Sequence, residues 1–210
     1  MHHKDHAFHP ERALSHLRDA DPVLAAIIER VGPYRLELRE PQFGTLVRSI
    51  IYQQLSGRVA SKILARLVEA MPEGRLSPEG VLALSLEQMR AVGLSGQKAA
   101  YLRDLAEKTL AGDVDFAALP SLADEAVIEH LTRVKGVGVW TAHMFLIFAL
   151  GRPDILPTGD LGVRAAMKKA YRMRALPKPE RMHKIAKRWR PYCSVASWYL
   201  WRSLENEAAL

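Results

Sequence analysis

Apolar residues recur at helical spacing along almost the whole chain, and Pro, Gly, Ser or Asp marks each break between the periodic segments. In the segment that starts near Pro41, one helical face carries Phe43, Leu46, Val47, Ile50, Ile51 and Leu55. Alternation of period two, which would indicate strands, does not dominate any segment. The pattern predicts an all-α fold.

Capping residues predict where the helices begin and end. Asp21-Pro22 is expected to open a helix that Gly32 ends, and Ser56-Gly57 separates the helix near Pro41 from one over 58–71. Ser77 and Ser85 each precede a short helix, and the turn at 93–96 precedes a helix that runs to 110. Further helices are expected over 121–134, 139–150, 160–174, 178–190 and 194–207. Disorder is expected only in the His-rich first ten residues.

Composition narrows the class of protein. The 210 residues are 49% hydrophobic and 25% charged, which suits one compact unit of one or two lobes. A net charge of +7 favours polyanionic partners. No apolar run approaches the roughly 18 residues of a membrane span, and the N-terminus lacks the apolar core of a secretory signal, so we expect an intracellular protein without membrane contact. The single cysteine, Cys193, excludes an internal disulfide and a four-cysteine iron-sulfur cluster.

A glycine hairpin joins the helices expected over 121–134 and 139–150. Its sequence is Val134-Lys135-Gly136-Val137-Gly138, in which two glycines allow a tight turn and a close backbone approach. Amides of such a turn, together with the start of the next helix, suit a phosphate oxygen. By itself the hairpin is better described as a turn between helices that binds no ligand, and the residues around it change that interpretation.

Residues 131–142, taken together with Asp160, resemble the helix-hairpin-helix DNA glycosylase superfamily, whose hairpin reads L-x-x-[LF]-P-G-[VI]-G-x-x-T-A before a catalytic aspartate. The DNA-3-methyladenine glycosylase II group is the most similar, through 156–160, Trp140 and 188–191, and the likeness runs from about Pro41 to Leu204. Lys135 replaces the usual proline, and the N-terminal β-domain of longer members is missing. The resemblance implies two helical lobes around a DNA-binding crevice, one formed by 1–40 with 155–210 and the other by 41–154, with the hairpin unit at 121–150.

Asp160 is the catalytic candidate. Breaking an N-glycosidic bond builds positive charge on the deoxyribose, which a nearby carboxylate stabilises. Asp160 could also be an ordinary N-cap of the helix that follows, and the two roles are compatible. Trp140 stands where bifunctional relatives carry a Schiff-base lysine, so the resemblance implies a monofunctional enzyme that leaves an abasic site.

The resemblance also implies a base pocket and a wedge. Trp140 and Trp201 would line the pocket, with Met144 and Trp198 beside them, and indole faces would attract positively charged alkylated purines. Leu55, with Gln54, would enter the duplex where the base is extracted, although Leu55 also fits the core face of its helix.

Contacts to the DNA backbone are expected from the hairpin and from basic helix faces. The hairpin residues are Lys135, Gly136, Val137, Gly138 and Thr141. The basic candidates are Arg48, Arg58, Lys62, Lys98, Arg164, Lys168 and Lys169. By resemblance, a structural Na⁺ or K⁺ could bind the main-chain carbonyls of Thr132, Val134 and Val137, while no cofactor and no iron-sulfur cluster are required.

The expected function is excision of alkylated purines of the 3-methyladenine and 7-methylguanine class from double-stranded DNA by a monomeric base excision repair enzyme. It would act in the bacterial cytoplasm at the nucleoid, or in the nucleus if the source is eukaryotic. Three alternatives stay open: a helix-hairpin-helix module that only binds DNA, a bifunctional glycosylase and lyase for oxidised bases, and a helical protein that binds an acidic partner, which only the net charge supports. The first would not need Asp160, Trp140 and Trp201 together, and the second would need a lysine nucleophile.

Overall fold

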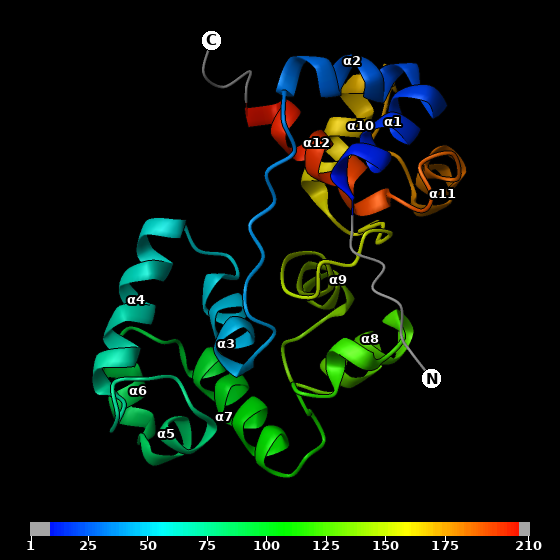
Figure 1. Ribbon diagram of the computed structural model, residues 1–210. Coiled ribbons are helices and arrows are strands. Elements are labelled where there is room, and N and C mark those ends of the chain that lie inside the picture. Colours follow the sequence, from blue (N-terminus) through cyan, green and yellow to red (C-terminus); the bar gives the residue numbers. More distant parts are fainter. Residues whose placement is uncertain (1–8, 206–210) are drawn as a thin grey trace, which may run out of the picture. The chain divides into compact units, whose positions relative to one another are not determined.

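The computed structural model describes residues 9–205, which form α-helices and one short 3₁₀ turn, with no strand among them (Figure 1). The predicted all-α class is confirmed. The chain divides into two compact units, which we call the central unit, Leu38–Leu150, and the terminal unit, formed by the residues up to Glu37 together with those from Gly151 onward. None of the described helices is long and apolar enough to cross a membrane.

The terminal unit packs helices from both ends of the chain around one core. It contains α1 (Pro10–Ala20), α2 (Pro22–Val31), α10 (Leu161–Ala170), α11 (Pro179–Ala186) and α12 (Cys193–Glu205). Helix α12 contacts both α2 and α10, and α1 packs on α2 (Figure 1). The largest side chains of this core are fully buried, among them Leu17, Leu24, Ile28, Trp189 and Tyr199. Burial of these apolar faces is what holds the two ends of the chain together.

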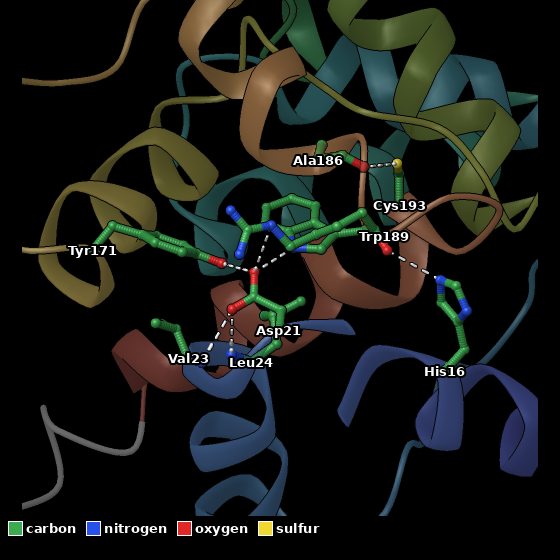
Figure 2. A network of polar contacts seen from close by, with 9 residues as sticks. His16, Asp21, Val23, Leu24, Tyr171, Ala186, Trp189 and Cys193 are labelled. Atoms are coloured by element: carbon green, nitrogen blue, oxygen red, sulfur yellow. Dashed lines mark hydrogen bonds and ion pairs between the residues drawn. The ribbon is translucent and has the colours of Figure 1, made fainter. Parts of the chain in front are cut away.

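A buried aspartate connects four of the five helices of this unit (Figure 2). Asp21 has no exposed surface, and its Oδ1 caps α2 by accepting from the amides of Val23 at 3.0 Å and Leu24 at 3.5 Å. Oδ2 accepts from the hydroxyl of Tyr171, just after α10, at 2.6 Å and from Nε1 of Trp189, just after α11, at 2.9 Å. The sequence predicted the cap and missed the two distant donors.

The central unit is continuous in sequence. Its helices are α3 (Phe43–Tyr52), α4 (Gly57–Ala70), α5 (Pro78–Ala83), α6 (Leu86–Ala91), α7 (Gly96–Leu110), α8 (Asp124–Thr132) and α9 (Val139–Phe148), with the 3₁₀ turn η1 (Leu119–Ser121) before α8. Helix α7 contacts α3, α5 and α6, and α8 pairs with α9. Ser77 and Ser85 cap α5 and α6 as predicted, and Ser85 forms a full capping box with Gln88.

Several predicted helix boundaries were too long. Helix α3 ends at Tyr52 rather than near Leu55, because Gln54 has a φ of 58° and cannot continue a right-handed helix. Helix α8 begins three residues after Ser121, where η1 occupies the predicted start. Helices α10 and α11 end before the predicted residues 174 and 190. The predicted end of the last helix at 207, and most of the predicted N-terminal disorder, lie outside the described residues, although Pro10 already begins α1.

Candidate functional site

Asp160 is a buried carboxylate at the N-terminus of α10. It is 8% exposed, and its Oδ1 accepts from the amide of Val163 at 2.7 Å and from Nε1 of Trp201 at 2.8 Å. The predicted N-cap role is therefore present in the structure. The bond from Trp201, a residue of α12, was not foreseen, and together the two donors fix the plane of the carboxylate.

Gly162 makes room for this pair. A Cβ at this position would lie 3.0 Å from Cδ1 of Trp201 and 3.1 Å from Oδ1 of Asp160. Because both neighbours are held by the same hydrogen bond, a larger residue would have to push them apart. The small residue at 162 thus allows the indole to reach the capping carboxylate.

The loop that leads to Asp160 is tied to the start of α12. Ser194 Oγ donates to the carbonyl of Arg152 at 2.6 Å and accepts from the amide of Ile155 at 2.9 Å. Asp154 accepts from a backbone amide at the start of α12 at 3.1 Å. Helix α12 therefore contributes to both sides of the carboxylate, through the loop before it and through the indole beside it.

Trp198, predicted beside the base pocket, is packed into an aromatic cluster of the terminal unit. It is 7% exposed, its ring centroid lies 4.9 Å from those of both Tyr34 and Tyr199, and the Arg202 guanidinium lies over its face at 5.6 Å. Its remaining surface lines a cavity of about 290 Å³ to which Asp160 and Trp201 do not contribute. Packing, the default for an aromatic residue in such a helix, describes Trp198 here.

The two hairpin glycines differ in backbone conformation and in the space around their Cα atoms. Gly136 has a φ of 79°, and a Cβ there would lie 2.1 Å from the ring of Tyr101, so the fold itself requires glycine. Gly138, the N-cap of α9, has an ordinary φ of −95°, and a Cβ there would meet no protein atom within 4 Å. The surface at Gly138 is therefore left open for something outside the protein to approach the backbone.

Asp104, a residue of α7, binds the hairpin through Lys135. Its Oδ2 accepts from the amide of Lys135 at 2.8 Å and from Nζ of Lys108 at 2.7 Å, and Nζ of Lys135 lies 3.4 Å from Oδ1. Burial alone would raise the pKa of the Asp104 carboxyl, but the hydrogen bonds and charges of the two lysines outweigh it and lower that pKa.

Two of the hairpin amides expected to face a ligand are used inside the protein. The amide of Lys135 is bound to Asp104, and the amide of Val137 donates to the carbonyl of Val134 at 3.1 Å. The expectation of outward amides is wrong for these two residues. Lys135 can still present its ammonium group, because its side chain is largely exposed.

The segment after α3 is attached to the hairpin. Gln53 Nε2 donates to the carbonyl of Gly136 at 2.9 Å. Lys98, expected to face DNA, instead donates to the carbonyls of Ile51 at 2.6 Å and Gln53 at 2.8 Å, and burial lowers its pKa. Leu55, two residues further on, is 37% exposed rather than buried on the α3 face. The hydrogen bonds of Gln53 and Lys98 thus fix the base from which Leu55 and Gln54 project.

A cavity of about 520 Å³ opens in the central unit beside this segment. Its apolar and aromatic wall consists of Tyr52, Trp140, Met144 and Phe148. Its polar lining consists of Arg39, Arg48, Ser49, Gln53, Gln54 and Thr141. The structure thus brings together four residues predicted at separate points of the chain, namely Trp140, Met144, Gln54 and Thr141. Arg39 and Tyr52 had carried no sequence signal.

Metal ligands of the usual kind are not clustered in the described part of the chain. No group of three or more His, Cys, Asp or Glu side chains among residues 9–205 could hold an ion. His143 is half-buried in α9, and burial lowers its pKa. Of the remaining basic candidates, Arg58 and Lys62 are exposed on α4, whereas Nε of Arg164 donates to the carbonyl of Pro177 at 3.1 Å.

An all-helical chain with a glycine hairpin between α8 and α9, followed by a buried aspartate that caps α10, has the architecture of a helix-hairpin-helix protein of DNA repair. Residues 47–191 match the family described as HhH-GPD superfamily base excision DNA repair protein, and the chain belongs to this superfamily. The predicted family, and base excision in DNA repair as its class of activity, are confirmed.

Relatives match over nearly the whole chain. DNA-3-methyladenine glycosylase 1 of Schizosaccharomyces pombe is 33% identical over 198 residues, which are 91% of this chain and 86% of that protein. The solved structure of the S. pombe 3-methyladenine DNA glycosylase in complex with abasic DNA has a TM-score of 0.80 and 33% identity, and covers 90% of this chain and 95% of the other. A DNA-3-methyladenine glycosidase from Bacillus halodurans has a TM-score of 0.83 and 35% identity, with 94% and 91% covered.

Proposed function

We propose that this protein is a monofunctional DNA glycosylase that flips out alkylated purines of the 3-methyladenine and 7-methylguanine class and removes them by hydrolysis. The observation that carries the proposal is the buried Asp160 carboxylate, held by Trp201 and Val163 in a chain of the base excision superfamily. The relatives are described as DNA-3-methyladenine glycosylases, one of them solved in complex with abasic DNA, and this supports alkylated bases in DNA as the substrate class.

The chemistry assigned to Asp160 follows from charge. When the C1′–N bond breaks, the departing base keeps the electron pair and the deoxyribose becomes cationic, so a fixed carboxylate stabilises the transition state. Water then adds to C1′ and loses a proton, which leaves an abasic site. An alkylated purine that carries a positive charge departs as a neutral base and needs less assistance than an ordinary one.

The absence of an amine at position 140 supports the monofunctional assignment. A lyase step through an imine needs a lysine nucleophile, and Trp140 occupies the position where bifunctional relatives carry one. No lysine lines the cavity of the central unit to which Trp140 belongs. Borohydride should therefore trap no covalent adduct between the protein and damaged DNA.

Two further parts of the protein would contact DNA: the segment with Leu55 and Gln54, and the glycine hairpin. Leu55 and Gln54 would fill the gap left by the extracted base, consistent with the exposure of Leu55 and the left-handed backbone of Gln54. Gly136, Gly138 and Thr141 would approach a phosphate at the start of α9, where the helix dipole favours an anion. The protein would act as a monomer at the bacterial nucleoid or in the nucleus, wherever its DNA is kept.

We propose that a monovalent cation binds at the hairpin. The carbonyls of Thr132 and Val134 lie at and just beyond the end of α8, and that of Val137 follows the Gly136 turn. Neutral carbonyl oxygens at the negative end of a helix dipole suit Na⁺ or K⁺. Bound there, the ion would stiffen the hairpin, and no other cofactor is required by the chemistry above.

The proposal is tested by measuring free bases released from duplex DNA that contains methylated purines. We expect release of 3-methyladenine and 7-methylguanine by the wild type and its loss in Asp160→Asn. Asparagine keeps the shape and an acceptor oxygen for Val163 and Trp201, so it removes the charge alone. Asp19→Asn, at an exposed position of α1, is the matched control. Normal base release by Asp160→Asn would contradict the assignment, and DNA binding without any base release would favour a binding module.

A further inference from the structure

Two arginines share the polar side of the central-unit cavity. Arg39 lies in the segment before α3 and Arg48 lies within α3, and both line the cavity of about 520 Å³ together with Trp140. The Arg48 guanidinium carbon lies 4.0 Å from the centroid of the Tyr52 ring, so this side chain is held against an aromatic face. Within residues 9–205, neither guanidinium group forms an ion pair with a carboxylate.

The arrangement places two like charges on the lining of one cavity. Burial lowers the pKa of Arg39, and the charge of Arg48 lowers it further. Two adjacent cations without a counter-charge destabilise each other, and an anion that bridges them relieves the repulsion. Guanidinium groups bind phosphate oxygens in pairs of parallel hydrogen bonds, which makes phosphate a particularly good partner.

The rest of the cavity lining also suits an anion. No aspartate or glutamate lines it, and the polar groups beside the arginines include the amides of Gln53 and Gln54. Trp140 and Thr141 belong to the first turn of α9, a helix of 10 residues whose positive end therefore borders the cavity. Hydrogen-bond donors and positive charge surround one aromatic wall.

We propose that Arg39 and Arg48 together bind one phosphate of the DNA strand that carries the extruded nucleotide, while the aromatic wall around Trp140 holds the nucleotide itself. A cationic alkylated base would be repelled by the two guanidinium groups, so the base is not their partner. The cavity is far larger than a phosphate ion, and this favours a phosphate that arrives as part of DNA. This inference rests on the proposed function, because it takes the nucleotide in the cavity to be the substrate.

The test measures binding rather than base release. Fluorescence anisotropy follows the full-length protein on a duplex with a tetrahydrofuran abasic-site analogue, in which single phosphates near the lesion are replaced by neutral methylphosphonates. The variants are Arg39→Gln/Arg48→Gln and a control, Arg66→Gln/Arg90→Gln, which removes two exposed charges from α4 and α6. Thermal unfolding followed by circular dichroism verifies that each variant folds.

We expect the double variant to bind the unmodified duplex at least about tenfold more weakly than the control, with a shallower dependence on salt, because one phosphate contact is lost. One methylphosphonate position should weaken the wild type and the control but have no further effect on the double variant. Arg48→Lys should recover only part of the affinity, because an ammonium group lacks the planar fork.

Three results would overturn the inference: equal affinities of the double variant and the control, additive losses at every methylphosphonate position, or saturable binding of inorganic phosphate that the double variant abolishes without any change in DNA binding. Base release is assayed in parallel. If binding behaves as expected but no base is released, the proposed function fails and the phosphate site stands. If bases are released and the double variant binds like the control, only the phosphate site fails.

Discussion

Replacing Trp201 by phenylalanine tests whether its indole positions the Asp160 carboxylate or only stacks against the base. The ring would be largely retained, but Oδ1 of Asp160 would lose the Nε1 donor that lies 2.8 Å away and keep the amide of Val163. A hydrogen bond to a charged group contributes about 1.5–3 kcal/mol. At roughly 1.4 kcal/mol per tenfold, we expect base release to slow between about tenfold and somewhat over a hundredfold.

The assay is a single-turnover measurement of base release, combined with anisotropy on the tetrahydrofuran duplex. A residue that positions the carboxylate changes the rate of release and leaves the affinity for abasic DNA nearly constant. A residue that only stacks against the base would instead alter the preference among lesions. Trp198→Phe is the matched control, because Trp198 lies one turn away in α12 and packs against Tyr34 and Tyr199.

The reasoning is refuted if Trp201→Phe releases bases at the wild-type rate, or if Trp198→Phe slows release as much. Gly162→Ala provides a second approach to the same pair, because its Cβ would press on both Trp201 and Asp160. It should slow release without removing any polar group.

Three further predictions concern the frame around the site. Asp21→Ala leaves Tyr171 and Trp189 without their acceptor, at about 1–3 kcal/mol each, and removes a helix cap that contributes about 1 kcal/mol. The free energy of unfolding, measured with urea, should therefore fall by about 3–7 kcal/mol. A decrease no larger than that of Asp19→Ala, at an exposed position, would disprove the network. Gly136→Ala should lower both the melting temperature and DNA affinity, whereas Gly138→Ala should lower affinity alone; equal melting of wild type and Gly136→Ala would be the contrary result. The pKa of Asp104 is lowered in the folded protein, so this carboxylate stabilises the fold at pH values above its unfolded pKa of about 3.9. The stabilisation is lost as the pH falls through the pKa of the folded protein. Asp104→Asn should therefore flatten the acid side of a curve of stability against pH, measured by urea unfolding.

Local signals in the sequence were sufficient for most of the fold. Caps at Asp21, Ser77, Ser85 and Asp160 were predicted because a capping side chain bonds an amide two or three residues away, within the reach of a sequence pattern. Errors in the helix ends arose where a single backbone conformation, such as the positive φ of Gln54, stops a helix whose apolar pattern continues.

Contacts between distant residues account for what was missed at the site. Lys98 was assigned to DNA because a lysine on a helix gives no indication that two carbonyls after α3 lie within its reach. Asp104 had no distinguishing feature in the sequence, yet it binds an amide 31 residues away. Arg39 lies in a segment without helical periodicity, and only the folded cavity shows it beside Arg48.

The hydrogen bonds of Asp21 also limit the order in which parts of the chain can fold during synthesis. Its hydroxyl and indole donors lie 150 and 168 residues after the carboxylate they bind, and the whole central unit is synthesised between them. On the ribosome, α1 and α2 therefore emerge with their apolar faces long before α10, α11 and α12 exist to cover them. The central unit, which is continuous, can fold first, and the terminal unit forms only after α12 has been synthesised. A truncated product that lacks α12 would carry an intact hairpin and an uncovered apolar surface, which is the form that cellular quality control has to remove.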